Sequence, residues 1–412
     1  MTMIPNRQLF PLLLIIFIDS MGYFIAIPVL VRILSPENAL LADSVSETTR
    51  NLLFSLALAI MPLAAIISRP IMGHLSDQFG RKKTLAICLV GSGGGFLITA
   101  LGMSISSFAL IVLGRLINGV AASSQAIAQA AITDLTAGKR KAFFLSINAL
   151  AMTFAMAGGS ALGGILSDPA LVSWFSDSTP FYAALLLVIV AWFLLIYSFS
   201  DTPYLPETTK SISLFSAFRQ LLTPAESAQL RWLLIIFFLL ELSWSLYYQA
   251  APLSFSEYYG TDATSIGLFM GYAGLWMCIG LGIVYGGLLR FANLPNVLMY
   301  CMTTCTLGAV LCGYLADFSG QWWVSIPIVL GVGMGYTTLL TLMSNIADIK
   351  QQGILMGLAG ATLAFAWLIT GSLSGILVNI FPSLPLHASG WLMALAFVLA
   401  FTWYKRFANH PR

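Results

Sequence analysis

Twelve apolar segments, each close to the length that crosses a bilayer, constrain the fold of this 412-residue chain more than any other feature. A helix needs about 20 mostly apolar residues to span the hydrocarbon core. Backbone polar groups in the membrane must be paired within the protein, so these segments are expected to be helices. The first run carries an internal acid and no small-residue cleavage site, so it is predicted to be a transmembrane helix rather than a signal peptide. The predicted spans are residues 9–34, 51–73, 84–104, 107–132, 142–167, 180–200, 232–256, 264–289, 296–317, 322–347, 353–380 and 387–404.

The composition excludes a soluble globular protein. Hydrophobic residues make up 58% of the chain and charged residues only 8%, whereas soluble domains carry roughly 25% charged residues. No loop is long enough for a soluble catalytic domain, and neither a phosphate-cradling loop nor a His-Glu-x-x-His motif occurs. We therefore expect a membrane protein that is not an enzyme, with no cofactor, metal or nucleic-acid partner. The five cysteines lie in apolar segments and are not expected to form disulfides: Cys88, Cys278, Cys301, Cys305 and Cys312.

A polar, proline-containing stretch, residues 201–231, separates six spans from six. We predict an all-α membrane protein with two pseudo-symmetric six-helix bundles, residues 1–200 and 232–412. The stretch between them is predicted to be a cytoplasmic linker in which Ser211–Leu222 forms an amphipathic surface helix. Paired halves of this kind are typical of transporters that bind substrate near the midplane, between the halves.

The basic residues predict the orientation, because cytoplasmic loops are enriched in Lys and Arg. Of 19 such residues, fifteen fall on one side of the predicted spans. Arg32 and Arg50 fall on the other side, and Arg69 and Arg115 lie within spans. Both termini are therefore expected in the cytoplasm.

Three ionisable residues within the predicted spans, Asp19, Arg115 and Glu241, are candidates for handling a coupled proton. A charge in hydrocarbon costs about 2.5 to 3.5 kcal/mol on insertion scales, so each needs a partner, a water-filled cavity or a function. Asp19 or Glu241 would carry the proton or bind a cationic substrate, and Arg115 would tune a nearby acid. The structural alternatives are an Asp19–Arg115 ion pair and an uncharged, hydrogen-bonded Glu241.

Polar residues recur at helical spacing around the acid and the base of the first half. Tyr23 lies one turn after Asp19 on the same face and is predicted to contact substrate. A stripe along the fourth span follows Arg115, and it must face protein or water because lipid offers no hydrogen bonds. We predict that the stripe contacts substrate through Asn118, Gln125 and Gln129.

Aromatic residues near the middle of spans in the second half are predicted to stack on an organic ligand. Anchoring at the membrane interface is the alternative role of such residues. A further polar stripe in the tenth span ends near its cytoplasmic side. The predicted substrate-binding residues of the second half are Trp244, Tyr248, Tyr336, Asn345 and Trp367.

Residues 73–85 form a short basic turn between the second and third spans. Here Gly73 and Gly80 are expected to let two helix ends approach closely, and Asp77 to face a helix N-terminus. Arg81 would help to hold the turn in the cytosol. This spacing resembles the loop 2–3 motif of the major facilitator superfamily.

Other segments of the first half resemble the drug–proton antiporter branch of that family, especially tetracycline-efflux-like proteins. The second half matches only in its hydropathy. The matching segments are Asp19–Gly22 with Ile27–Leu30, Gly114–Gly119, Ala131–Asp134 with Arg140 and Phe143, and Gly158–Gly164.

The resemblance implies alternating access driven by the proton gradient. It implies a cytoplasmic charge network of Asp77, Arg81 and Asp134, which acts as a gate. It also implies proton handling by Asp19 and Arg115. Small residues in the fifth span imply close helix packing at Gly159, Gly163 and Gly164.

The predicted function is a proton-coupled secondary transporter for a small organic molecule, acting as a monomer in the inner membrane of a bacterium. Its expected partners are the substrate, protons and membrane lipid, and export of a drug or metabolite is the first prediction. Ser160 stands where the family motif usually has a proline that is associated with export. Import of a nutrient, or of a metal-chelating metabolite such as a siderophore, therefore remains an alternative. A non-transporting receptor or scaffold and an intramembrane enzyme are more distant alternatives.

Overall fold

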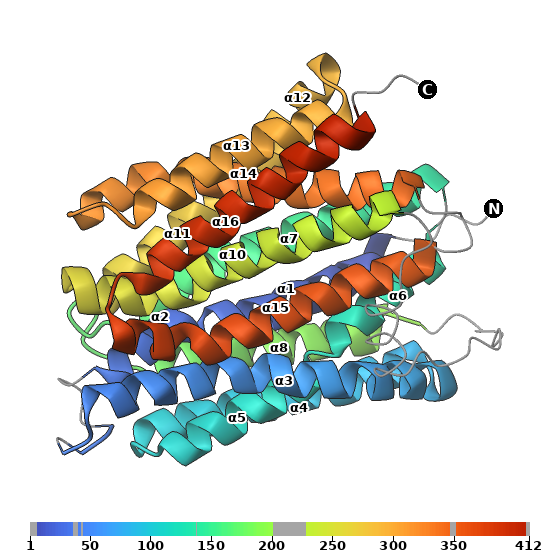
Figure 1. Ribbon diagram of the computed structural model, residues 1–412. Coiled ribbons are helices and arrows are strands. Elements are labelled where there is room, and N and C mark those ends of the chain that lie inside the picture. Colours follow the sequence, from blue (N-terminus) through green and yellow to red (C-terminus); the bar gives the residue numbers. More distant parts are fainter. Residues whose placement is uncertain are drawn as a thin grey trace. The chain divides into compact units, whose positions relative to one another are not determined.

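The computed structural model describes residues 6–35, 40–42, 44–136, 138–200, 228–346 and 352–408. These residues form helices and no strand (Figure 1). Twelve helical segments are long and apolar enough to cross a membrane, as predicted. The helices are α1 (Leu9–Phe24), α2 (Ala26–Leu34), α3 (Glu47–Phe79), α4 (Arg81–Ser104), α5 (Phe108–Ala121), α6 (Ser124–Leu135), α7 (Gly138–Leu166), α8 (Thr179–Ser198), α10 (Ala228–Tyr259), α11 (Ala263–Ile279), α12 (Tyr285–Phe291), α13 (Leu294–Cys312), α14 (Phe318–Ile346), α15 (Gln352–Ile380) and α16 (Leu384–Trp403).

Helix α3 is longer than the predicted second span, residues 51–73, at both ends. At its start the Ser46 hydroxyl accepts a hydrogen bond from the Thr49 N–H at 3.3 Å, which satisfies one unpaired donor of the first turn. At its end Gly80 has φ of +94°, a conformation that glycine adopts without steric cost. Gly80 alone separates α3 from α4, so the basic turn is mostly helical.

Among the described residues, three spans are interrupted away from their ends. The first breaks at Ile25, the fourth at Ala122 and Ser123, and the eighth contains a π-helical turn at Gly280–Val284. At the break in the fourth span the Ser123 hydroxyl donates to the carbonyl of Val120 at 2.9 Å. Serine hydroxyls that bond nearby carbonyls compete with the helical hydrogen-bond pattern.

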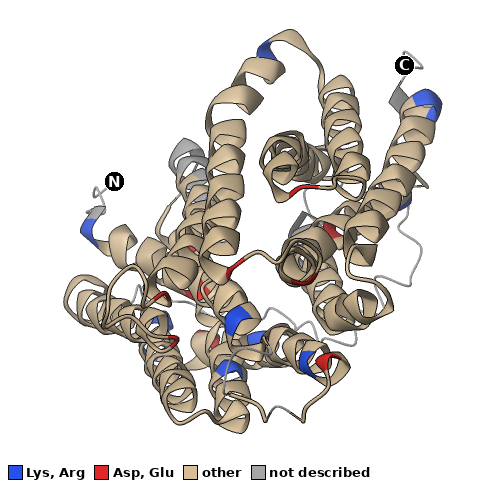
Figure 2. Cartoon of the chain, turned by 90° about the vertical axis from the view of Figure 1, so that its left-hand side faces the viewer, with Lys and Arg blue, Asp and Glu red and all other residues tan. Residues whose placement is uncertain are grey.

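Charged residues are sparse along the helices, and most of the chain is neutral (Figure 2). Large apolar side chains instead point outward, among them Phe291, Trp323 and Ile283, which are 91%, 76% and 73% exposed. Such exposure suits contact with lipid tails rather than water. The five cysteines are buried and form no disulfide.

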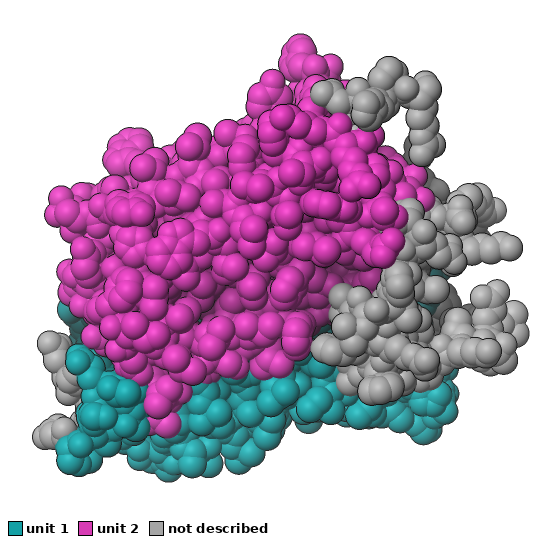
Figure 3. Space-filling view, in the orientation of Figure 1, with its two compact units in different colours: residues 1–50, 56–213, 262–271 teal, residues 51–55, 214–261, 272–412 magenta. Residues whose placement is uncertain are grey.

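The chain forms two compact units (Figure 3). In the first unit α1 packs on α6, α7 and α8, and α4 packs on α5 and α8. In the second unit α10 packs on α14, α15 and α16, and α13 packs on α14 and α16. The first unit comprises residues 1–50, 56–213 and 262–271, and the second residues 51–55, 214–261 and 272–412.

These units differ in detail from the predicted halves, 1–200 and 232–412. Residues 51–55 of α3 group with the second unit, where the Ser55 hydroxyl accepts the Gly375 N–H at 2.7 Å. Residues 262–271 group with the first unit. Helix α10 begins at Ala228, inside the predicted linker 201–231. The rest of that linker, with the predicted surface helix Ser211–Leu222, lies outside the described residues.

Candidate functional site

Asp19 lies in the middle of the first span, on α1, and is only 7% exposed. The hydroxyl of Ser124, at the start of α6, donates a hydrogen bond to its carboxylate. The neighbouring Gln125 amide donates to the Ser20 hydroxyl at 3.2 Å. The break in the fourth span therefore places the first turn of α6 against the acid on α1.

Arg69 of α3 lies near enough to Asp19 for its positive charge to act on the carboxylate, although the two side chains form no direct ion pair. Its Nη2 donates to Oε1 of Gln125 at 3.3 Å. Asp19, Arg69 and Gln125 thus form one polar cluster across α1, α3 and α6. Sequence reasoning noted Arg69 within a span but gave it no role. In the predicted span 51–73 Arg69 lies only four residues from the end, and the longer helix Glu47–Phe79 places it ten residues from the end.

Arg115 of α5 has a different environment from the predicted one. Its Nε donates to the carbonyl of Ala57 at 2.6 Å, and its Cζ lies 5.7 Å from the centre of the Tyr23 ring. It is 1% exposed, and no ion pair with a carboxylate is found for it among the described residues. The alternative in which Arg115 pairs with Asp19 is therefore wrong for this structure.

The predicted polar stripe of the fourth span does not stay on one face, because the helix breaks at Ala122 and Ser123. Asn118, before the break, faces α4, where a Cβ at Gly95 would overlap its side chain. Gln125, after the break, faces α1 and α3. Gln129 is half-buried one turn further along α6. The prediction assumed a continuous helix, but the helix is interrupted at Ala122 and Ser123.

In the second unit Glu241 lies on α10 and is 2% exposed. Trp367 of α15 and Tyr336 of α14 lie near its carboxylate. The rings of Trp244 and Tyr248 are 5.2 Å apart, and those of Tyr248 and Trp367 are 6.2 Å apart. The structure thus brings Glu241 together with four of the predicted aromatic residues.

Gln249 is a member of this cluster that sequence reasoning missed. Its amide donates to the Thr370 hydroxyl at 2.7 Å and to the carbonyl of Trp367 at 3.1 Å. The Thr370 hydroxyl in turn contacts that of Ser245 at 3.0 Å. Gln249 lies eight residues after Glu241, two helical turns along the same face, and this spacing could have indicated it.

Asn345 does not join the cluster. It is exposed near the end of α14. The prediction rested on its place in a polar stripe. At this position, close to the end of α14, the side chain is exposed rather than buried. The role of Asn345 in binding stays a prediction, and it lies apart from the buried residues around Glu241.

At the end predicted to be cytoplasmic, Arg81 contacts two carboxylates. Its Nη1 lies 2.7 Å from Asp77, and its Nε lies 3.2 Å from Asp134. The Ser76 hydroxyl accepts a further bond from Arg81 at 3.0 Å. The predicted charge network is thus brought together at the junction of α3, α4 and α6. Gly73 differs from its prediction, since a Cβ there would meet nothing within 4 Å.

The glycines of α7 lie where backbones approach closely. A Cβ at Gly159 would stand 3.0 Å from the Met21 carbonyl oxygen. One at Gly163 would overlap the Ile25 carbonyl, and one at Gly164 would stand 2.8 Å from the Ala263 carbonyl oxygen. Close approach of small residues is the usual basis of helix association in membranes.

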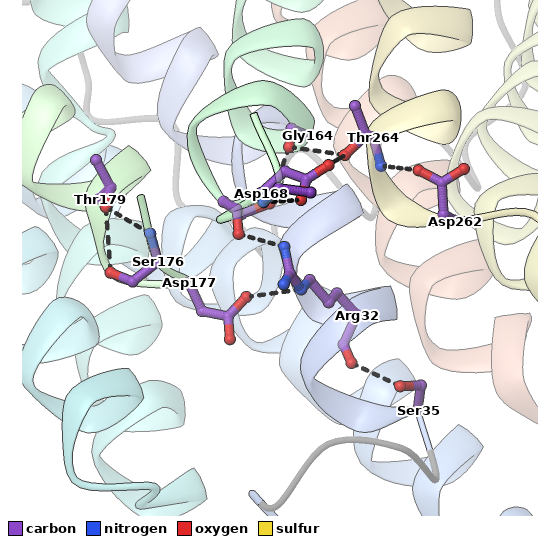
Figure 4. Close-up of polar contacts among 11 residues, drawn as sticks. Arg32, Ser35, Gly164, Asp168, Ser176, Asp177, Thr179, Asp262 and Thr264 are labelled. Atoms are coloured by element: carbon purple, nitrogen blue, oxygen red, sulfur yellow. Dashed lines mark hydrogen bonds and ion pairs between the residues drawn. The ribbon is translucent and has the colours of Figure 1, made fainter. Parts of the chain in front are cut away.

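A polar cluster that was not predicted lies where α7 ends and α8 and α11 begin (Figure 4). Arg32 pairs with Asp177 at 3.4 Å and donates to the Ser167 carbonyl. The Thr264 hydroxyl donates to Asp168 at 2.8 Å.

Asp262 precedes α11 in this cluster and caps it. Its carboxylate accepts the N–H groups of Thr264 and Ser265 at 3.0 and 3.1 Å and the Ser265 hydroxyl at 2.6 Å. Partial burial opposes ionisation, but these hydrogen bonds outweigh it and hold the pKa of Asp262 below its usual value.

Comparison with known proteins places this geometry in a family. The profile of the Major Facilitator Superfamily matches residues 9–370. Tetracycline resistance protein class B of Escherichia coli is 25% identical over 397 residues, covering 93% of this chain and 92% of that protein. Multidrug resistance protein 2 of Bacillus subtilis is 22% identical over 355 residues, covering 84% and 85%.

A solved structure shares the fold. The structure of a D-xylose–proton symporter superposes with a TM-score of 0.72 at 16% identity, covering 96% of each chain. The resemblance inferred from the sequence motifs is therefore confirmed. The chain belongs to the Major Facilitator Superfamily of membrane transporters, and tetracycline resistance proteins are among its relatives.

Proposed function

We propose that this chain is a proton-coupled secondary transporter that moves a small organic molecule out across the cytoplasmic membrane by alternating access. One observation carries the proposal: among the described residues, each unit buries a single carboxylic acid deep within a span, Asp19 in the first and Glu241 in the second. The free energy of a carboxylate depends strongly on whether it faces water or protein. A conformational change that alters this exposure can therefore drive proton uptake and release.

The surroundings of the two acids support a division of labour. Arg69 and the first turn of α6 hold Asp19 in a hydrogen-bonded, charged setting. Glu241 lies among Trp244, Tyr248, Tyr336 and Trp367, whose faces suit a moderately apolar organic ligand. One elementary charge moving through 100 mV releases about 2.3 kcal/mol, enough for a roughly fifty-fold substrate gradient.

Export is supported by the relatives, which are named as resistance proteins for tetracycline and for multiple drugs. Import is the second candidate, and the observation in its favour is Ser160. This residue is fully buried in α7 between the closely packed glycines, at the position where the export-associated proline is expected.

Everted membrane vesicles, acidified inside and loaded with a pH-sensitive fluorophore, test the function. An exporter exchanges added tetracycline, or another probe from a compound panel, for luminal protons, so fluorescence recovers. Asp19→Asn and Glu241→Gln should abolish the recovery. Glu47→Gln, an exposed acid at the start of α3, should leave it unchanged. Recovery that survives both buried-acid variants would contradict the proposed coupling.

The same vesicles separate the alternatives. If substrate preloaded into the lumen leaves together with protons, the protein is a symporter that imports in the cell. If a compound binds the purified protein but causes no proton movement in either arrangement, the receptor alternative replaces the transporter.

A further inference from the structure

Arg115 pairs with no carboxylate among the described residues, and Arg69 is the cation near Asp19. We propose that Arg115, held by Tyr23 and the Ala57 carbonyl, binds the negatively charged group of the transported molecule, so the substrate is an organic anion such as a carboxylate. The proposal rests on the proposed transport function and names the substrate class for it.

The first argument is charge balance. Away from the ends of the described spans of the first unit, the charged residues are Asp19, Arg69 and Arg115. Asp19 balances one arginine, and Arg69 is the arginine whose charge acts on it, with Gln125 bonded to Arg69 between the two helices. Among the described residues of this unit, Arg115 therefore carries a positive charge with no acidic counterpart inside the membrane, where such a charge costs about 2.5 to 3.5 kcal/mol. An anionic ligand supplies the missing charge.

The second argument is hydrogen bonding. A guanidinium has five N–H donors in a planar fork that matches a carboxylate. Arg115 uses Nε on the Ala57 carbonyl at 2.6 Å, while its Nη2 is buried with no hydrogen-bond partner among the described residues. The side chain is 1% exposed, so water does not supply this partner freely in the present conformation. A buried charged donor of this kind is available to a ligand acceptor.

Arg50 shows what a purely structural buried arginine looks like in this protein. It is 3% exposed, and each of its three guanidinium nitrogens donates to protein carbonyls. The acceptors are the carbonyl oxygens of Leu34, Ser35, Leu41, Ala42 and Val45. Arg115, by comparison, bonds one carbonyl and has a guanidinium nitrogen without a hydrogen-bond partner among the described residues. The guanidinium of Arg50 is saturated, and that of Arg115 is not.

Tyr23 completes the geometry. Its ring centre lies 5.7 Å from Cζ of Arg115, a distance at which the ring face stabilises a cation. This contact and the Ala57 carbonyl hold the guanidinium, while Nη2 has no hydrogen-bond partner among the described residues. Tyr23 is also one turn after Asp19 on α1, so the anion site would adjoin the proton-carrying cluster.

Thermal unfolding of the purified full-length protein tests the proposal with benzoate as the probe. Benzamide, which has nearly the same shape without the charge, is the matched ligand control, and sodium chloride keeps ionic strength constant. Benzoate should raise the melting temperature of the unmodified protein more than benzamide does. Arg115→Gln should weaken benzoate binding by about tenfold or more, the equivalent of about 1.4 kcal/mol.

Arg115→Lys keeps the charge without the fork, so it should retain part of the benzoate effect and guard against a folding defect. Arg290→Gln, which removes an exposed arginine at the end of α12, should retain all of it. An equal response to benzoate and benzamide, or full benzoate stabilisation of Arg115→Gln, would overturn the anion site. Proton movement in the vesicle assay would then still stand, so failure of this inference is distinguishable from failure of the proposed function.

Discussion

The arginines of the first unit show how a single residue type is used in three environments. Arg50 is saturated by carbonyl oxygens, Arg69 lies beside a carboxylate, and Arg115 has unused donors. The cost of removing each side chain should therefore differ, although all three lie within α3 or α5. Stability measurements on variants separate these roles.

Arg50→Ala should lower the free energy of unfolding by at least about 1.5 to 3 kcal/mol, the contribution of one hydrogen bond to a charged group. The reason is that carbonyls near the end of α2 and in the following segment lose their shared donor. Arg50→Lys should recover only part of this loss, because an ammonium group cannot span all the acceptors. Unfolding of purified protein measures both; equal stability of Arg50→Ala and unmodified protein would refute the structural role.

Asp19 and Arg69 should be energetically coupled. Either Asp19→Asn or Arg69→Gln alone leaves a charged group without its opposite, whereas the double variant removes both charges. The double-mutant cycle should give a coupling of about 0.5 to 3 kcal/mol. The same cycle with Arg115→Gln in place of Arg69→Gln should give a smaller value, and a larger one would return Arg115 to the role of counter-ion.

At the scale of the helices, α7 packs closely against the interrupted first span because the residues of α7 at the contact are glycines, which have no side chain. Two glycines of α7 differ in what surrounds them. Gly163 faces the Ile25 carbonyl, whereas a Cβ at Gly158 would meet nothing within 4 Å. They provide a matched pair for testing close packing.

Gly163→Ala should destabilise the protein by about 1 to 3 kcal/mol, because the added methyl group forces backbones apart. Gly158→Ala should be neutral or stabilise slightly, since alanine favours the helix by about 0.5 to 1 kcal/mol over glycine. Thermal unfolding of the two variants measures the difference. Equal melting temperatures would mean that α7 can move away from α1 and α2 without cost.

The start of α11 should show a pH-dependent contribution from Asp262. Hydrogen bonds hold its pKa below the usual value of 3.8, so its stabilisation is complete above that value and lost as pH falls through the lower folded-state pKa. Asp262→Ala should therefore cost about 1 kcal/mol at neutral pH, as expected for a helix cap. The difference from unmodified protein should shrink below about pH 4. A difference that stays constant down to pH 2 would argue against the charged cap.

At the scale of the whole molecule, the membrane orientation can be tested because all native cysteines are buried. Ser173 is exposed between α7 and α8, and Gln78 is exposed near the end of α3. The distribution of basic residues predicts that Ser173 faces the outside and Gln78 the cytoplasm. A membrane-impermeant maleimide should label Ser173→Cys in intact cells and Gln78→Cys only after permeabilisation. The reverse pattern would invert the topology.

The sequence predicted most of the architecture because apolar length alone identifies membrane spans. It did not predict the break at Ser123, because a hydroxyl that bonds a carbonyl leaves hydropathy unchanged. Its alternative reading paired Asp19 with Arg115 rather than with Arg69. The pattern within one helix does not show which face of α3 lies towards α1. Glu241 and its aromatic neighbours were easier to find, since they recur along one face of α10 and near the middle of other spans.

The approach of Gly163 to the Ile25 carbonyl ties the evolution of two distant positions together. A side chain at position 163 can be accommodated only if the first span straightens or shifts near residue 25. Among descendants of a common ancestor, exchanges at these positions should therefore appear as covarying pairs. A lone replacement of the glycine should be rare.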